Sequence, residues 1–199
     1  MRKDGILRRA VGLLLILTVI CGFLYMPAVT GLAQLLFPYE ANGSIIEIDG
    51  KAYGSQLLGQ EFRDASHLWG RVMNVDTVTY KDENGRAVMY ASPSNLSPAG
   101  EKYEKLVAER VAQIKAANPD AKMETIPVEL VTCSGSGLDP EISPAAAEYQ
   151  VPRIAENTDY TEDEVREIIE RYTTGRFLGI FGEPRVNVLE VNLALEGIL

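Results

Sequence analysis

The sequence predicts an α+β fold in which one N-terminal transmembrane helix is followed by a single mixed α/β domain with a small sheet. Three observations predict it. A run of thirty uncharged residues lies near the N-terminus of the 199-residue chain. The chain is 46% hydrophobic and 24% charged, which is a globular balance, and its length suits one core. Beyond the uncharged run, short β-type stretches alternate with helical patterns.

The uncharged run extends from residue 10 to residue 39. About 20 apolar residues in a helix cross a bilayer core, so this run can span it with some tilt. We expect a transmembrane helix over residues 10–36, with Pro27 as the point where it can kink. Three glycines would allow partner helices to approach it closely: Gly12, Gly22 and Gly31.

The charges before this run predict its orientation. One acid, Asp4, precedes it together with four basic residues: Arg2, Lys3, Arg8 and Arg9. The positive-inside rule therefore places residues 1–9 in the cytoplasm and residues 37–199 in an extracytoplasmic domain of a single-pass protein. The membrane would be a bacterial or archaeal cell membrane. A signal peptide cleaved near Thr30 is disfavoured because the apolar run continues beyond that residue.

The composition excludes several classes of function. The net charge is −9, and residues 40–199 hold 15 basic against 27 acidic residues, which argues against nucleic acid as a partner. One histidine, His67, and two cysteines, Cys21 and Cys133, exclude a disulfide scaffold and a zinc site of the usual Cys/His kind. We expect no catalytic residue, no metal site and no covalently bound cofactor.

Several short stretches have the pattern of β-strands. Residues 44–48 lead into an Asp49-Gly50 turn, which is typical of a hairpin. Residues 76–80 and 86–91 flank a second polar turn and predict another pair of strands. Residues 127–132 alternate and are rich in β-branched side chains, so we expect a strand there too.

Two helices are predicted in the middle of the domain. Residues 99–117 carry apolar side chains at helical spacing, and the pattern ends before Pro119. A second helix begins at Pro144, with the Ser143 hydroxyl as its N-cap. We expect Pro152 to interrupt this helix.

Two further helices are predicted towards the C-terminus. Thr161 and Glu164 form a capping box, and we expect Gly175 to stop the helix that follows. Its many acidic residues are interpreted as a solvated face. Residues 186–195 suit a strand or a helix, and the spacing of their apolar side chains favours a helix.

The loop CSGSGLDP, at residues 133–140, matches neither of two well-known glycine-containing motifs. A nucleophile elbow needs glycine two residues before its serine, but Ser134 holds that place before Ser136. A P-loop needs Gly-Lys-Ser/Thr after its glycines, and Leu-Asp-Pro follows here instead. We interpret the loop as a strand-to-helix connection in which Asp139 binds backbone amides. Alternatively, its exposed amides could bind an anion or the backbone of a partner.

Several motifs together resemble the C subunits of the Kdp potassium-transporting P-type ATPases. The most specific are LVTCSGSGLDP at 130–140, ISPAA at 142–146 and QVPRIA at 150–155. Others are QLLFP at 34–38, ANGS at 41–44, GSQLLGQ at 54–60, LG at 178–179 and GEPRVNVLE at 182–190. The match runs nearly end to end, although Cys133, Glu141 and most of residues 61–94 depart from the family pattern.

The resemblance implies a non-catalytic accessory subunit of a high-affinity, ATP-driven complex that imports potassium. Its implied partners are a channel-like potassium-binding subunit, a P-type ATPase subunit, a small stabilising peptide and membrane lipid. It also implies a catalytic chaperone that raises the ATP affinity of the ATPase subunit, with Gln150 in contact with nucleotide. The residues implied in the signature loop and in partner contact are Ser134, Gly135, Ser136, Gly137, Asp139, Ser143 and Arg153.

Three different hypotheses stay open on the residues alone. An extracytoplasmic domain does not meet cytoplasmic ATP, so the predicted topology argues against the nucleotide role. The acidic domain could instead cap the outer mouth of the potassium pathway and raise the local cation concentration. The chain could also be a free-standing anchored binding module, or a serine hydrolase that uses Ser134 or Ser136.

Overall fold

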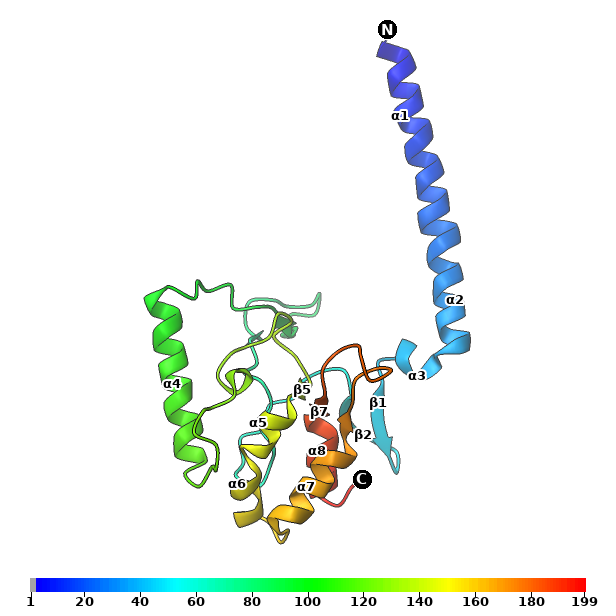
Figure 1. Cartoon of the computed structure of the whole chain (residues 1–199). Coiled ribbons are helices and arrows are strands. Elements are labelled where there is room, and N and C mark those ends of the chain that lie inside the picture. Colours follow the sequence, from blue (N-terminus) through cyan, green and yellow to red (C-terminus); the bar gives the residue numbers. More distant parts are fainter. Residues whose placement is uncertain (1–2) are drawn as a thin grey trace. The chain divides into compact units, whose positions relative to one another are not determined.

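The computed structural model describes residues 3–199 and divides into two compact units (Figure 1). The first ends at Ile45 and is helical, and the second is an α+β unit that extends over Ile46–Leu199. The predicted α+β class with one apolar N-terminal helix is therefore confirmed, but three small sheets are present where one was predicted.

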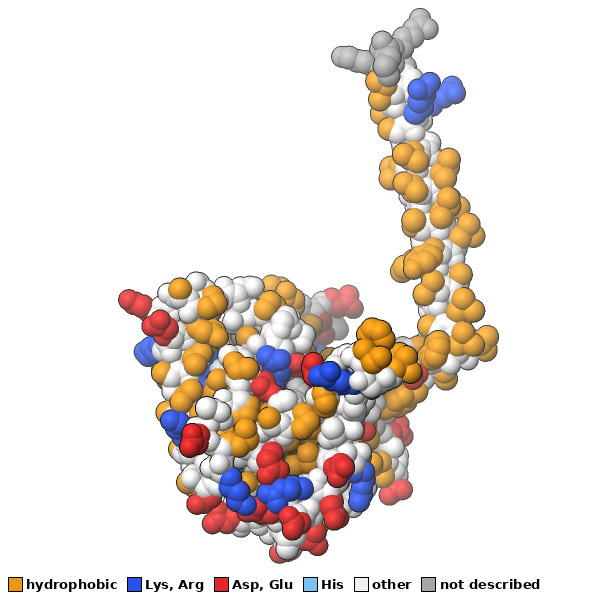
Figure 2. All heavy atoms as spheres, viewed as in Figure 1, with side chains coloured by type: hydrophobic (Ala, Val, Ile, Leu, Met, Phe, Trp, Pro, Cys, Tyr) orange, Lys and Arg blue, Asp and Glu red, His pale blue; other side chains and the backbone are white. Residues whose placement is uncertain are grey.

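The first unit consists of a long helix and one short helical turn. α1 (Lys3–Leu17) passes into a π-helical segment, η1 (Thr18–Tyr25), and then into α2 (Met26–Leu36); α3 (Pro38–Ala41) follows. Gly5–Leu36 is long and apolar enough to cross a membrane. Figure 2 shows hydrophobic side chains along the whole of this helix. A helix that is apolar on all sides requires lipid or other helices around it.

Pro27 accounts for the π-helical segment. It is the second residue of α2, and it has no N–H to donate to the preceding turn. The chain widens the turn before it, and the N–H of Met26 donates to the carbonyl of Cys21, five residues back. Pro27 is thus accommodated by a widened turn within a continuous helix.

The strands of the second unit are short and form three small sheets. β1 (Ile45–Ile48) pairs with β2 (Lys51–Ser55) across the predicted turn, where Asp49 and Gly50 both have positive φ. β3 (Val75–Asp76) pairs antiparallel with β4 (Tyr90–Ala91). The third sheet is antiparallel, with the order β5-β7-β6: β5 is Glu141–Ile142, β7 is Arg185–Asn187 and β6 is Thr173–Thr174.

Helices supply most of the core. They are α4 (Glu101–Ala117), α5 (Pro144–Glu148), α6 (Val151–Glu156), α7 (Glu162–Arg171) and α8 (Val188–Leu195). Seven of the eight residues of α8 are buried, which explains why six of its eight residues are apolar. α7 packs its apolar face inward through Val165, Ile168 and Ile169 and keeps its acidic face in water. The predicted helix over 99–117 and the Thr161–Glu164 capping box are confirmed. The helix predicted over 186–195 begins only at Val188, because Val186 and Asn187 belong to β7.

The strand predicted over residues 127–132 is wrong. The chain forms a 3₁₀ turn there, η2 (Val128–Leu130), after Pro127. Leu130 and Val131 are both buried although they are neighbours, so the residues do not alternate between two faces. The pair predicted over 76–80 and 86–91 is reduced to β3 and β4 with one bridge between Lys81 and Ala87.

Two predicted helix boundaries also need correction. Pro152 does not break a helix, because α5 has already ended and Pro152 lies in the first turn of α6, where no N–H is needed. Gly175 is not the stop of α7. That helix ends at Arg171, because the chain turns directly into β6, whose Thr173 pairs with Val186 of β7.

Candidate functional site

Two buried side-chain amides hold the segment that contains Leu68 and Trp69. Asn192 of α8 accepts from the Leu68 N–H at 2.7 Å and donates to the Leu68 carbonyl at 2.9 Å. Gln150, the N-cap residue of α6, accepts from the Trp69 N–H at 2.9 Å and donates to the Trp69 carbonyl at 3.0 Å. Each amide thus satisfies both backbone groups of one residue, as a neighbouring strand would.

Gln150 is completely buried and its amide is fully engaged. Besides Trp69, its amide nitrogen donates to the Ala146 carbonyl at 3.0 Å, and its oxygen accepts from Arg153 Nη2 at 2.7 Å. These bonds use both N–H donors and both lone pairs of the amide. The residue implied in nucleotide contact therefore lies in the core as a cross-link between α5, α6 and the Trp69 segment.

Arg153 is the second buried member of this cluster and is 4% exposed. It donates four hydrogen bonds to neutral oxygens: Asn118 Oδ1, Gln150 Oε1 and the carbonyls of Asp64 and Ala65. Its guanidinium lies 4.5 Å from the centre of the Trp69 ring. Burial lowers the pKa of Arg153 to about 10, so it remains charged at neutral pH. The cluster thus stabilises a buried charge by dipoles and by a ring face.

The signature loop is held mainly by its own hydroxyl groups and by close backbone contacts. Ser134 Oγ accepts from the Gly137 N–H at 3.0 Å, and Ser136 Oγ accepts from the Leu138 N–H at 3.2 Å. Gly137 has a φ of +74°, and its carbonyl accepts from the Asn74 N–H at 3.1 Å. Gly135, in contrast, has room for a side chain, because a Cβ at this position would meet no atom within 4 Å. The serines thus serve as local acceptors for backbone N–H groups.

Charged residues connect this loop to its surroundings. Asp139 accepts from the Glu141 N–H at 3.1 Å and forms an ion pair with Arg71 at 3.3 Å. Ser143 caps α5 by accepting from the Ala146 N–H at 3.1 Å, and its own N–H donates to Glu129 at 3.1 Å. Burial opposes ionisation of Glu129, but the hydrogen bonds from Ser143 and the charge of Arg71 outweigh it and lower the pKa of Glu129. The predicted cap at Ser143 is confirmed.

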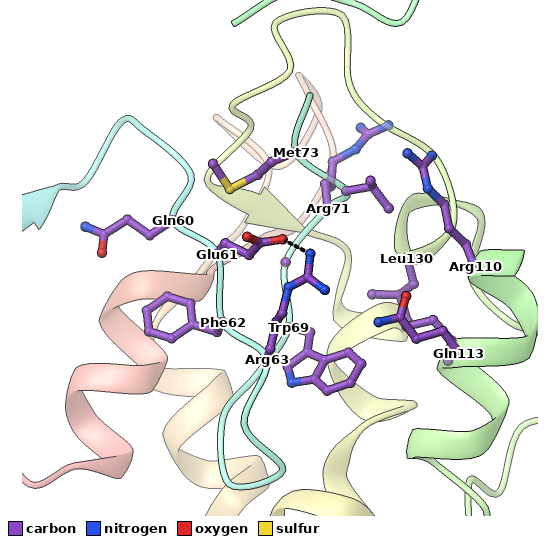
Figure 3. A pocket seen from close by; sticks show the side chains of 13 residues that line it. Gln60, Glu61, Phe62, Arg63, Trp69, Arg71, Met73, Arg110, Gln113 and Leu130 are labelled. Atoms are coloured by element: carbon purple, nitrogen blue, oxygen red, sulfur yellow. Dashed lines mark hydrogen bonds and ion pairs between the residues drawn. The ribbon is translucent and has the colours of Figure 1, made fainter. Parts of the chain in front are cut away.

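A pocket opens beside the buried cluster (Figure 3). Trp69 and Phe62 supply aromatic walls, and three arginines line it: Arg63, Arg71 and Arg110. Arg63 forms an ion pair with Glu61, the dashed line in Figure 3, and Arg110 donates to the Val131 carbonyl at 3.3 Å. Within residues 3–199, no group of three His, Cys, Asp or Glu side chains is placed to hold a metal ion.

The structure therefore separates the residues that the sequence grouped together. Gln150 and Arg153 lie in one buried cluster, whereas Ser134, Gly135, Ser136, Gly137 and Asp139 form a loop anchored elsewhere. His67 contacts Glu196 at 2.8 Å and its neighbour Ser66 at 3.3 Å and stacks on Phe62, so the described contacts do not join it to Ser134 or Ser136. Sequence reasoning missed Asn192, Asn118 and Trp69; an Asn inside the apolar run of 186–195 was the available signal.

Comparison with known proteins identifies the family. Residues 7–197 match the family described as KdpC, "K+-transporting ATPase, c chain". The chain belongs to the KdpC family.

KdpC-family relatives cover almost the whole chain. One from Clostridium perfringens, named "Potassium-transporting ATPase KdpC subunit", is 61% identical over 98% of both chains. A relative of the same name from Clostridium botulinum is 56% identical and covers 96% of this chain and 95% of its own. One from Rhodopseudomonas palustris is 47% identical over 96% of both. The resemblance inferred from the motifs is thus confirmed.

Gly137→Ala tests the close approach of the signature loop. A Cβ at Gly137 would lie 2.6 Å from the Ser92 carbonyl oxygen and 2.9 Å from that of Asn74, and its φ is positive. We expect a loss of about 2–4 kcal/mol in the free energy of unfolding, measured by urea titration of the full chain in detergent. The matched control is Gly135→Ala, where a Cβ meets nothing within 4 Å. Equal losses in both variants would contradict the described packing.

Gln150→Leu tests the buried cross-link. The substitution leaves the Trp69 backbone groups and one N–H of Arg153 without their partner, at a cost of about 3–5 kcal/mol. Urea unfolding can be followed by the emission of Trp69, the only tryptophan of the chain. Gln113→Leu, at an exposed position of α4, is the control and should change stability by less than about 0.5 kcal/mol. A Gln150→Leu chain as stable as the control would refute the cross-link.

Proposed function

We propose that this chain is a non-catalytic accessory subunit of an ATP-driven potassium import complex. The observation that carries the proposal is the match to the KdpC family over residues 7–197, together with relatives named as subunits of a potassium-transporting ATPase. The exposed apolar helix supports it, because its side chains need lipid or partner helices around them. The partners would be a channel-like potassium-binding subunit, a P-type ATPase subunit and a small stabilising peptide.

We further propose that Gly5–Leu36 anchors the chain in a cell membrane and that the α+β domain faces the extracytoplasmic side. The four basic residues at the N-terminal end of the chain, all before residue 10, support this orientation. Residues 40–199 carry an excess of 12 acidic charges, which would enrich cations at the outer mouth of the potassium pathway. This effect extends over about 8 Å at physiological salt, so it acts only close to the surface.

A role in ATP affinity is proposed as an indirect effect. Gln150 is fully buried and its amide is saturated, which favours a positioning residue over one that touches nucleotide. The subunit would then change the ATP affinity of the ATPase subunit through the assembly. The competing hypothesis, an anchored binding module with no nucleotide role, shares the same anchor and differs in its partners.

Purification of the full-length tagged chain from mild detergent tests the assembly. We expect a polytopic potassium-binding protein and a P-type ATPase to be recovered in a fixed ratio. Leu15→Arg should abolish this recovery, because a charge within the apolar helix costs up to about 2.5–3.5 kcal/mol on insertion and disturbs helix packing. Leu15→Ile is the matched control and should assemble normally.

The recovered complex also provides the readout for ATP. Addition of this subunit to the other subunits should lower the ATP concentration at half-maximal hydrolysis. Recovery of the chain alone would overturn the subunit proposal and favour the binding module. A complete complex whose ATP dependence is the same with and without this subunit would overturn only the ATP role.

Labelling with a membrane-impermeant thiol reagent tests the orientation. In a chain without Cys21 and Cys133, Lys102→Cys places one thiol on the exposed face of α4. We expect the reagent to label it in intact cells. Lys3→Cys, before the apolar helix, is the control and should be labelled only after the cells are lysed. The reverse pattern would place the domain in the cytoplasm.

A further inference from the structure

An apolar hairpin tip, residues 177–181, stands out on the surface of the domain (in the orange segment between α7 and β7 in Figure 1). Its four large side chains are among the most exposed hydrophobic groups of the α+β unit. Their exposed fractions are 71% for Phe177, 73% for Leu178, 71% for Ile180 and 62% for Phe181. A cluster of this kind indicates a surface that is covered by something other than water.

The backbone of the tip is closed on itself. The Phe177 N–H donates to the Phe181 carbonyl at 2.8 Å, and the Phe181 N–H donates back to the Phe177 carbonyl at 3.0 Å. Within the turn, the Gly179 N–H donates to the Arg176 carbonyl and the Ile180 N–H donates to that of Phe177. Four of the five N–H groups of the tip are therefore bonded internally. Leu178 and Gly179 have positive φ, which makes this tight closure possible.

Internal hydrogen bonding favours lipid over a protein groove as the occupant. In hydrocarbon, a backbone N–H finds no other partner, so a segment that enters it must satisfy its own donors. A protein partner could supply acceptors and would not require this closure. The base of the hairpin is polar, with an ion pair between Arg176 and Glu183 at 2.5 Å. Apolar side chains above a charged base match the boundary between acyl chains and headgroups.

The chain itself keeps the domain near a membrane. Only nine residues separate Leu36, the end of α2, from Ile46, the start of the α+β unit. Fully extended, they reach about 30 Å. We propose that the apolar tip inserts into the lipid interface of the membrane in which the chain is anchored, as a second point of membrane contact. This inference rests on the proposed function, in which Gly5–Leu36 spans that membrane.

The test uses tryptophan as a probe of lipid contact. The full chain carrying Leu178→Trp is reconstituted in vesicles of phosphatidylethanolamine and phosphatidylglycerol, with or without bromine on the acyl chains. We expect a blue shift of its emission and a loss of intensity in the brominated vesicles. Val78→Trp is the control, since Val78 is 77% exposed but lies outside the tip. Its emission, like that of the wild-type chain with Trp69 alone, should be the same in both vesicles.

A charged variant makes the test specific. Adding Phe181→Asp to the Leu178→Trp chain should restore the emission in brominated vesicles, because a carboxylate opposes insertion into lipid. Phe181 is exposed, so its replacement leaves the core of the domain unchanged. Equal emission of Leu178→Trp in both vesicles, with the chain bound to them in a flotation assay, overturns the insertion and leaves the proposed function intact. A blue shift without quenching, seen only in the purified complex, overturns it in favour of a partner groove. A chain that does not float with the vesicles overturns the anchor and the insertion together.

Discussion

The α+β unit depends on two side-chain amides that act in place of a β-strand. Asn192 and Gln150 satisfy both backbone groups of Leu68 and of Trp69, and the rest of the buried cluster is arranged around them. Without such partners, a buried irregular segment would leave its N–H and C=O groups unpaired, each at a cost of about 1–3 kcal/mol. The short strands of the three sheets could not provide them. The amides therefore allow an irregular chain to cross the middle of the core.

The same constraint explains why Arg153 can be buried. Gln150 is already fixed by Trp69, so its oxygen is pre-oriented towards Arg153 Nη2, and the Trp69 ring is held against the guanidinium. The charge is distributed over several fixed dipoles, which costs less than solvating it with mobile groups. Gln150, which the resemblance implies in nucleotide contact, and Arg153, which it implies in partner contact, thus both stabilise the same buried cluster.

The sequence predicted the features that depend on residues close together in the chain, such as helix caps, tight turns and the apolar helix. The capping box at Thr161 and Glu164, the Ser143 cap, the Asp49-Gly50 turn and the uncharged helix depend on neighbours a few residues apart. Gln150 and Trp69 are 81 residues apart, and Asn192 and Leu68 are 124 apart, so no local pattern reveals those pairs. The wrong strand at 127–132 has the same cause. Its β-branched residues suit a strand, but no strand lies beside them to pair with in the described part of the chain, and packing of Leu130 and Val131 decides their conformation.

The close packing of Gly137 against the main chain of Asn74 and Ser92 affects which parts of the sequence can vary between members of the family. The segment from Asn74 to Ser92 is attached to the signature loop through main-chain atoms: the Asn74 N–H and carbonyl and the Ser92 carbonyl surround Gly137. Every amino acid has a carbonyl, and every one but proline has the N–H, so the attachment places little demand on the side chains between the two ends. The segment can therefore exchange its sequence, and with it its surface chemistry, while its base stays in register. The attachment point at Gly137 can therefore hold exposed segments of different sequence in the same position.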